Sequence, residues 1–362
     1  MTSPLIVDAH EDLAWNILAF GRDYTRSAKD TRQVEAGQPA PQHNGDTLLG
    51  WPDYQRGRVA VVFGTLFASP MRRRLGDWET QTYADLAEAH RIYRDQLHAY
   101  ESLTDKHSDK FRLIETNRNL QDIVSDWQST AETHPVGLVI LMEGAEGVRT
   151  PSELAEWWQW GVRIIGPAWA GTRFCGGTRE PGPLTEDGIE LLNGMADLHY
   201  TLDLSHMDEL SVRQCLDMYP GPIIASHANT AARIAQYSGN RQLTDPVIRG
   251  IIERNGVIGV IPFCRFLDYG WNPADGRDSL TLGNLSDHID HICQLAGNAA
   301  HVGIGSDFDG GFGLNSAPGD VDTIADLQKL VPILAARGYT QEDTAAILGG
   351  NWLRHLEENL PV

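Results

Sequence analysis

Side chains that can bind metal ions follow five short apolar segments of the sequence. Two of them follow the first segment, and one follows each of the other four. They are His10, Asp12, Glu143, His206, His227 and Asp307. Imidazole and carboxylate groups together suit zinc and other borderline divalent ions. A single histidine in such a place is more often a hydrogen-bonded structural residue, so the case for a metal site depends on whether the fold brings these residues together.

The spacing of the histidines and carboxylates fits two ions. His10 and Asp12 lie two residues apart, so on an extended segment their side chains point the same way and can bind one ion. Glu11 lies between them and is expected to face the other way, as a structural or supporting carboxylate. His206 and His227 follow consecutive apolar segments and can bind a second ion.

Glu143 comes between these two pairs along the chain, which makes it a candidate for a carboxylate that bridges two ions. Two metal ions a few ångström apart would activate a bridging hydroxide and polarise a carbonyl oxygen. Asp307 could then accept the proton of the water and pass it to a leaving amine. The predicted chemistry is therefore hydrolysis of an amide.

The elements that must position these residues are eight short apolar segments with helical patterns between them. Their near-continuous apolar character suits strands that are buried on both faces of a parallel sheet. The segments span 4–9, 59–67, 136–142, 162–168, 200–205, 222–226, 256–263 and 301–306. Their alternation with helices predicts an α/β fold, a single (β/α)₈ TIM-like barrel over residues 1–362. The C-terminal ends of barrel strands meet on one face, so the candidate ligands would converge there.

Three segments carry further expectations. The stretch of about 17–57 contains a Gly-, Pro- and Gln-rich part and is expected to form a long loop over the barrel mouth. Residues 340–359 are expected to form two short helices broken at Gly349–Gly350. His288 and His291 are three residues apart in a helix predicted over 285–298, and we expect them on its solvated outer face.

The composition excludes several classes of protein. The chain has 49 acidic and 29 basic residues and a formal net charge of -20, which argues against binding to nucleic acid or to an anionic membrane surface. The four cysteines are far apart in the sequence, which disfavours a disulfide framework and a thiolate zinc site. The sequence has no secretory leader pattern and no apolar run of transmembrane length, so it predicts a cytoplasmic protein.

Taken together, the motifs resemble the membrane (renal) dipeptidase family, peptidase family M19, of the amidohydrolase superfamily. The resemblance covers about residues 5 to 358 and includes "DAHEDLAW", "MEGAEG", "PIIASHAN", "HVGIGSDFDG" and "LGGNWLRHLE". It implies a distorted barrel with two zinc ions, of which one is bound by the first His–Asp pair, the other by the later two histidines, and both by Glu143. It further implies that Asp307 is the acid/base, that Arg241 contacts the substrate, and that the protein is a homodimer. Such enzymes hydrolyse dipeptides, and several accept a D-residue on the C-terminal side.

One position departs from the family pattern. Well-studied members carry a histidine after the fourth strand that stabilises the carbonyl oxygen in the transition state, whereas here Trp169, in "GPAWAGTRFCGG", aligns with it. The metal ions, Arg173 or a main-chain donor are the alternatives for that role. Loss of one such donor typically lowers the rate about 100- to 1,000-fold. Trp169 and Arg173 are both predicted to contact the substrate.

The sequence thus predicts a binuclear, zinc-dependent dipeptidase that acts on small dipeptides, including L-Xaa-D-Xaa pairs. One alternative keeps the chemistry and changes the substrate, to an N-acyl amino acid or another small amide. The other alternative is a barrel that binds a ligand but has lost efficient turnover, and it is motivated by the missing histidine.

Overall fold

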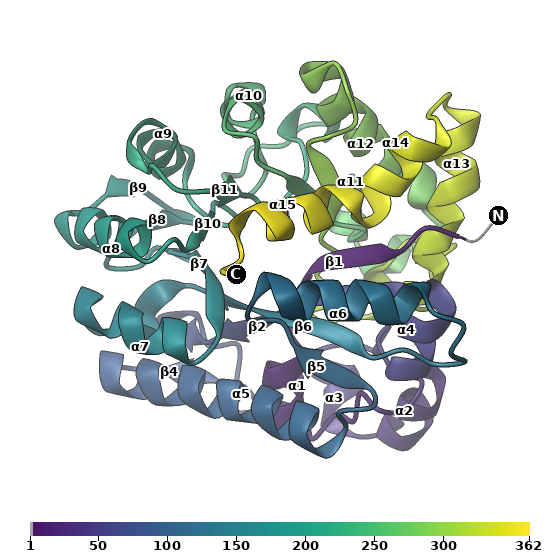
Figure 1. Cartoon of the computed structure of the whole chain (residues 1–362), viewed down its shortest axis with the longest axis horizontal. Coiled ribbons are helices and arrows are strands. Elements are labelled where there is room, and N and C mark those ends of the chain that lie inside the picture. The colour runs from purple at the N-terminus through teal and green to yellow at the C-terminus, as the bar shows by residue number, and fades with distance from the viewer. Residues whose placement is uncertain (1–2) are drawn as a thin grey trace.

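The computed structural model describes residues 3–362 and contains a nearly closed barrel of eight parallel strands (Figure 1). The barrel strands are β1 (Ile6–Glu11), β2 (Val59–Phe67), β6 (Val136–Glu143), β7 (Val162–Gly166), β10 (Thr201–Asp203), β11 (Ile223–Ile224), β12 (Ile258–Val260) and β13 (Val302–Ile304). Hydrogen bonding runs in this order around the barrel, and β13 pairs with β1. A bridge between Ala225 and Ile258 joins β11 to β12. The predicted TIM-like barrel is confirmed.

The central strand β6 explains why the apolar segments become parallel strands. All of its residues are buried, and it is hydrogen-bonded to β2 on one side and to β7 on the other. A strand covered on both faces needs apolar side chains at nearly every position. The register pairs Glu143, its last residue, with Phe67 and with Gly166. Glu143 is therefore placed at the end of the barrel where the neighbouring strands also end.

Helices surround the strands (Figure 1). They are α1 (Leu13–Phe20), α2 (Ala28–Glu35), α3 (Pro39–His43), α4 (Trp51–Gly57), α5 (Leu86–Lys106), α6 (Asn117–Gln128), α7 (Leu154–Gln159), α8 (Glu186–Asp197), α9 (Glu209–Met218), α10 (Asp245–Glu253), α11 (Cys264–Leu267), α12 (Leu282–Ala296), α13 (Leu330–Ala336), α14 (Gln341–Ala345) and α15 (Asn351–Asn359). The longest, α5, begins after Asp85, whose side chain accepts a hydrogen bond from the N–H of Glu88. None of the helices in the described part of the chain combines the length and the apolar character that a membrane span requires.

Five short strands are additions to the barrel. They are β3 (Ser69–Pro70), β4 (Thr82–Tyr83), β5 (Phe111–Leu113), β8 (Cys175–Gly177) and β9 (Glu180–Leu184). Strand β5 pairs with the first residues of β6, below the point where β7 begins to pair with it. The pairs β3–β4 and β8–β9 form separate two-stranded sheets. Runs of two to five residues carry too little periodicity to be recognised in a sequence.

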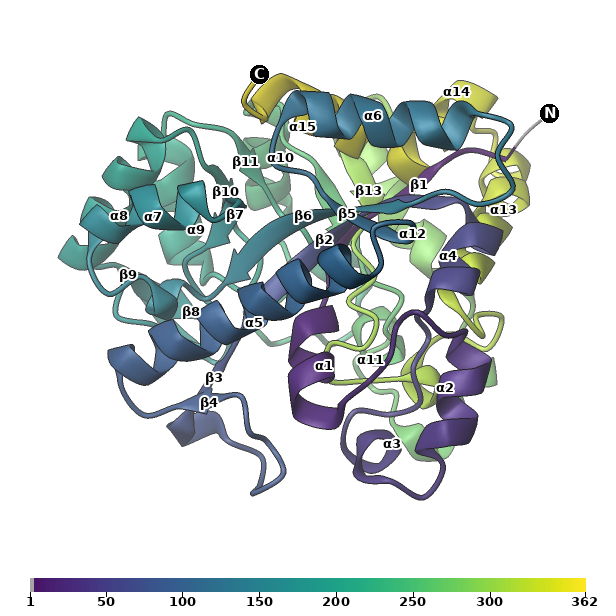
Figure 2. The ribbon, with the colours of Figure 1, turned by 60° about the horizontal axis from the view of Figure 1, so that its bottom comes forward.

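The stretch of about 17–57, expected as a long loop, instead carries the second half of α1 and all of α2, α3 and α4. Figure 2 shows α1, α2 and α3 on the same side of the molecule as β3 and β4, and α6 and α15 on the opposite side. Pro39, from the Pro-rich part that favoured a loop, lies in the first turn of α3, and Pro52 lies in the first turn of α4. Proline is tolerated there because the first N–H groups of a helix have no partner within it.

Two expectations about helices are wrong. The C-terminal helix does not break at Gly349–Gly350 but continues through a π-helical segment, Ala346–Gly350. A Cβ on Gly349 would lie 2.7 Å from the carbonyl oxygen of Leu5, so close packing on β1 accounts for this glycine. His288 is not solvated but 1 % exposed, and its Nδ1 accepts a hydrogen bond from the N–H of Thr230 at 3.2 Å.

Candidate metal centre

The predicted ligands converge at the C-terminal ends of the barrel strands, where they meet a cavity of about 430 Å³. Asp12, Glu143 and His206 line this cavity. His10 and His227 are buried against the same cluster, each 1 % exposed. Residues more than two hundred positions apart in the sequence are therefore brought within reach of one another.

Glu143 lies at the centre of the cluster. Its Oε1 atom is 3.1 Å from Nε2 of His206, 3.4 Å from Nε2 of His227 and 3.9 Å from Nε2 of His10. The Nε2 atoms of His206 and His227 are 3.0 Å apart. One carboxylate oxygen thus faces the ring nitrogens of histidines from three strand ends, which is the position that a shared ligand would need.

Three groups of residues offer ligand atoms that all lie within 4.8 Å of one another. The first contains His10, Asp12 and Glu143, and the second contains Glu143, His206 and His227, as the sequence predicts. The third joins His10 and His227 to Asp307, whose Oδ1 atom is 3.8 Å from Nε2 of His10. Glu143 belongs to both of the predicted groups.

Two buried carboxylates inside the barrel fix the backbone at the ends of neighbouring strands. Asp8 accepts a hydrogen bond from the N–H of Ser306 at 2.6 Å, and Asp203 accepts one from the N–H of Ser226 at 2.8 Å. The backbone φ angle is 66° at His206 and 57° at Asp307, in the left-handed region that residues other than glycine rarely adopt. Such strain persists only where the surrounding structure enforces it, and it is typical of functional sites.

Hydroxyl groups orient three of the candidate ligands. Thr178 Oγ1 lies 3.0 Å from Nδ1 of His206, and Ser226 Oγ lies 2.8 Å from Nδ1 of His227. The hydroxyl of Thr65 donates to Asp12. Partners of this kind set the tautomer and the direction of a metal ligand. Thr65 and Thr178 could not be identified from the sequence, because they come from other segments and no spacing rule connects them to the ligands.

The electrostatics of the cluster fit a bound cation. Burial raises the pKa of Glu143 and of Asp307 well above the usual range, and the nearby Asp12 raises both further. Burial lowers the pKa values of the three histidines, which favours the neutral imidazoles that ligate metals. Oε1 of Glu143 is buried and has no hydrogen bond among the described residues. A divalent ion would provide the partner that this oxygen lacks.

Arg241, predicted to contact the substrate, lines the same cavity and is 7 % exposed. Its Nη2 atom donates a hydrogen bond to the carbonyl oxygen of His227 at 2.7 Å. Its Nε and Nη1 atoms are buried and have no partner in the described part of the chain. Buried guanidinium donors are rarely left unsatisfied, so these atoms are available for an anionic group in the cavity.

The two other predicted substrate contacts lie in different places. Trp169 lines the cavity, with its ring 6.2 Å from that of His206 and 5.1 Å from that of Phe67. Arg173 does not line this cavity, and its guanidinium is 3.0 Å from Asp187 and 2.6 Å from the carbonyl oxygen of Val148. The guanidinium of Arg173 is thus engaged outside this cavity, and its contact with the substrate stays a prediction.

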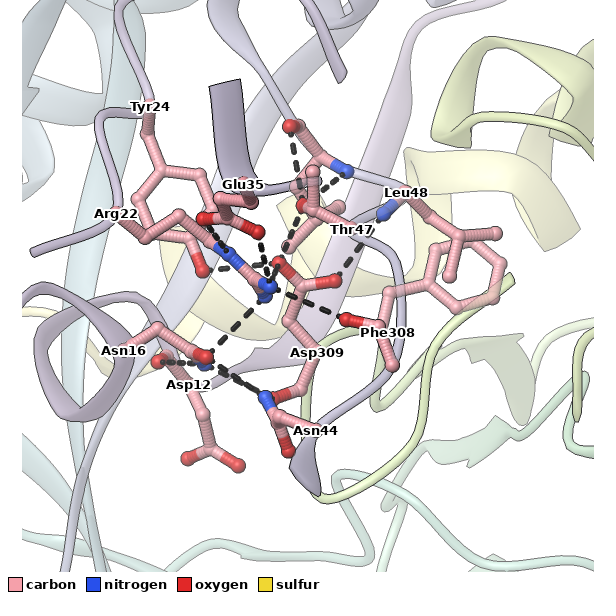
Figure 3. Close-up of polar contacts among 12 residues, drawn as sticks. Asp12, Asn16, Arg22, Tyr24, Glu35, Asn44, Thr47, Leu48, Phe308 and Asp309 are labelled. Atoms are coloured by element: carbon pink, nitrogen blue, oxygen red, sulfur yellow. Dashed lines mark hydrogen bonds and ion pairs between the residues drawn. The ribbon is translucent and has the colours of Figure 1, made fainter. Parts of the chain in front are cut away.

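A buried polar network supports the cavity from the α1–α2 side (Figure 3). At its centre, the Asp309 carboxylate accepts hydrogen bonds from Arg22 at 3.0 Å and from the hydroxyl of Tyr24 at 2.9 Å. The side-chain amide of Asn16 donates to the carbonyl oxygens of both Asp12 and Asp309, each at 2.9 Å. The network therefore connects the backbone of a candidate ligand with the loop that follows β13.

The chain is similar in sequence to known dipeptidases. The sequence profile of the family described as "Membrane dipeptidase (Peptidase family M19)" matches residues 1–360. The chain is 26% identical over 312 residues to "Dipeptidase verJ" of Clonostachys rogersoniana, a match that covers 83% of this chain and 73% of that one.

Two solved structures share the fold. One is described as dipeptidase AC, a metallo peptidase of family M19, with a TM-score of 0.79, 23% identity and 100% of both chains covered. The other is a metallo peptidase from Rhodobacter sphaeroides, solved with a phosphinate mimic of the dipeptide L-Ala-D-Ala. It has a TM-score of 0.77 and 22% identity, and the match covers 99% of this chain and 100% of that one.

Proposed function

The chain belongs to the membrane dipeptidase family, peptidase family M19, and we propose that it is a zinc-dependent dipeptidase with two ions that share Glu143. The observation that carries the proposal is the position of Glu143 Oε1 opposite the Nε2 atoms of three histidines. In this proposal, one ion is held by His10 and Asp12, and the other by His206 and His227. Two zinc ions bound there would activate water and polarise the scissile carbonyl group.

Asp307 is the acid/base of this proposal. It lines the cavity, and burial raises its pKa well above the usual range of an aspartate. A carboxyl group with a raised pKa can take a proton from water and return it to the leaving amine near neutral pH. The proton would be held on the carboxylate of Asp307 between these two transfers.

Arg241 binds and orients the substrate in this proposal. Its unsatisfied Nε and Nη1 atoms can donate to the C-terminal carboxylate of a dipeptide. Binding of that end places the amide over the ligand cluster and leaves the C-terminal side chain beside the rest of the cavity wall. The Trp169 ring covers the His206 side, and its contact with substrate stays a prediction.

We further propose that the C-terminal residue of the substrate is a D-amino acid. The Rhodobacter sphaeroides protein was solved with a phosphinate mimic of L-Ala-D-Ala, which motivates this choice. The predicted homodimer and the predicted cytoplasmic location stay predictions from the sequence.

A panel of substrates offered to the zinc-loaded protein tests the proposal. L-Ala-D-Ala, L-Ala-L-Ala and N-acetyl-alanine differ in stereochemistry or in the free amine, and hydrolysis is followed by the release of alanine. We expect hydrolysis of dipeptides, with L-Ala-D-Ala preferred. Hydrolysis of N-acetyl-alanine alone would indicate an amidohydrolase of acyl amino acids. No hydrolysis of any compound would indicate a barrel that binds ligands without turnover.

A further inference from the structure

One wall of the cavity carries three arginines that form no ion pair with a carboxylate. Among residues 3–362, Arg179, Arg241 and Arg265 form no ion pair, although all three line the cavity. The fourth arginine of the lining, Arg73, is paired with Glu180 at 2.7 Å. Unmatched arginines concentrated on one wall are notable in a chain with a formal net charge of -20.

The turn that carries Arg179 is fixed next to the segment that carries Arg241. It lies in the turn between β8 and β9 with a φ angle of 64°, and its N–H donates to Oδ1 of Asn240 at 2.9 Å. The side-chain amide of Asn240 donates in turn to the carbonyl oxygen of Gly177 at 2.9 Å. The turn that carries Arg179 is therefore fixed to the residue that precedes Arg241.

Arg265 is connected to Arg241 through two tyrosines that also line the cavity. Arg265 is on α11, and its guanidinium carbon lies 5.7 Å from the ring centroid of Tyr269. That ring is 5.5 Å from the ring of Tyr237, whose hydroxyl accepts a hydrogen bond from the N–H of Arg241 at 2.5 Å. The three arginines thus belong to one continuous wall.

Within residues 3–362, the one acidic side chain of the lining that lies outside the candidate site does not pair with this wall. Outside the candidate ligands and Asp307, the acidic residue of the lining is Glu79. It is 5 % exposed, and its carboxylate accepts hydrogen bonds from the hydroxyl of Ser69 and, at 2.6 Å, from the N–H of Leu75. Glu79 therefore stabilises its own loop and pairs with none of the three arginines.

We propose that the wall of Arg179, Arg241 and Arg265 selects dipeptides whose C-terminal residue is aspartate or glutamate. The inference rests on the proposed function, in which Arg241 binds the C-terminal carboxylate. The substrate then presents a second carboxylate, on its side chain, to Arg179 and Arg265. Guanidinium groups match the planar carboxylate with two parallel N–H donors. Because Arg179 and Arg265 are exposed, we expect selectivity of about tenfold.

The test compares two substrates that differ in charge but hardly in size, Ala-Glu and Ala-Gln, each with a D- or an L-residue at the C-terminus. In the wild-type protein, kcat/KM for Ala-Glu should exceed that for Ala-Gln by about tenfold. In the double variant Arg179→Gln/Arg265→Gln, the ratio should fall to near one. The ratio is measured within one preparation, so a partial loss of folded protein cancels. A wild-type ratio near one, or a ratio that the double variant retains, would overturn the proposal.

Arg213→Gln is the matched control. Arg213 lies on α9, is 51 % exposed and pairs with Glu209, and it does not line the cavity. This variant removes one positive charge from the surface and should retain the wild-type ratio. Equal hydrolysis of Ala-Glu and Ala-Gln by the wild type would refute the selectivity and leave the dipeptidase function intact. A failure to hydrolyse any dipeptide would refute the proposed function itself.

Discussion

The guanidinium group of Arg22 lies 3.0 Å from the carboxylate of Asp309, and neither side chain is exposed to solvent. Arg22 follows α1, and Asp309 follows β13, two residues after Asp307. Arg22 also donates two hydrogen bonds to Glu35, at 2.9 and 2.8 Å. This ion pair therefore ties the α1–α4 segment to the loop that carries the candidate acid/base.

Arg22→Met should destabilise the fold strongly. The variant leaves the carboxylate of Asp309 buried without its cation, and an uncompensated buried charge costs about 3–5 kcal/mol. Urea unfolding of the two proteins measures the difference. Arg26→Met is the control, because Arg26 and Asp23 form an ion pair in which both side chains are more than 40% exposed (49%/43%). Loss of this exposed pair should lower the free energy of unfolding by less than about 1 kcal/mol. Equal decreases in the two variants would contradict a larger contribution of the buried Arg22–Asp309 pair.

His288 should make the stability depend on pH. Burial lowers its pKa to about 3, against about 6.5 in an unfolded chain, so the unfolded state binds more protons between these values. The free energy of unfolding should therefore fall as the pH drops below about 6.5, by roughly 2 kcal/mol at pH 5 from this residue. His288→Asn keeps an acceptor for Thr230 and removes the titration. Urea unfolding at pH 7 and pH 5 should show a smaller loss in the variant, and an identical loss would exclude this role.

Thr178→Val should weaken metal binding. The variant removes the hydroxyl 3.0 Å from Nδ1 of His206 and keeps the shape of the side chain. Loss of such a partner lowers metal affinity about 10- to 100-fold, which competition with a zinc chelator can measure. Thr104→Val is the control, since the hydroxyl of Thr104 donates to the backbone of α5. Equal zinc affinity in the wild type and Thr178→Val would rule out an orienting role.

Asp307→Asn separates the acid/base role from a ligand role. If Asp307 transfers protons, kcat should fall at least about 100-fold while the zinc content stays at the wild-type level. Because Asp307 also forms a candidate ligand group with His10 and His227, zinc content decides between the two roles. A loss of zinc that parallels the loss of kcat would assign Asp307 as a ligand.

The barrel could be predicted from the sequence because its strands are buried on both faces. The eight apolar segments correspond to the eight barrel strands, and their C-terminal ends bring the six predicted residues together. Even the exclusion of Glu11 follows from strand alternation: it belongs to none of the ligand groups, and it accepts a hydrogen bond from Tyr54 on α4. Side chains point to alternate sides along a strand, so the sequence alone indicates which of three consecutive residues faces away from the other two.

Tertiary contacts explain what the sequence did not reveal. Arg22 and Asp309 lie 287 positions apart in the sequence, and no sequence motif connects them. The helices α2, α3 and α4 are five to eight residues long, too short for periodicity to identify, and depend on such contacts. The partners of Arg173, Asp187 and the carbonyl oxygen of Val148, could not be read from the sequence either.

The zinc content of the purified protein, compared with that of Glu143→Ala, tests the central claim most directly. A carboxylate shared by two ions predicts close to two zinc ions per chain in the wild type and a sharp decrease in the variant. Bound zinc should also stabilise the folded state, so a chelator should lower the melting temperature of the wild type. A wild-type protein without zinc whose stability is unchanged by the chelator, or a variant that keeps two zinc ions, would contradict the account.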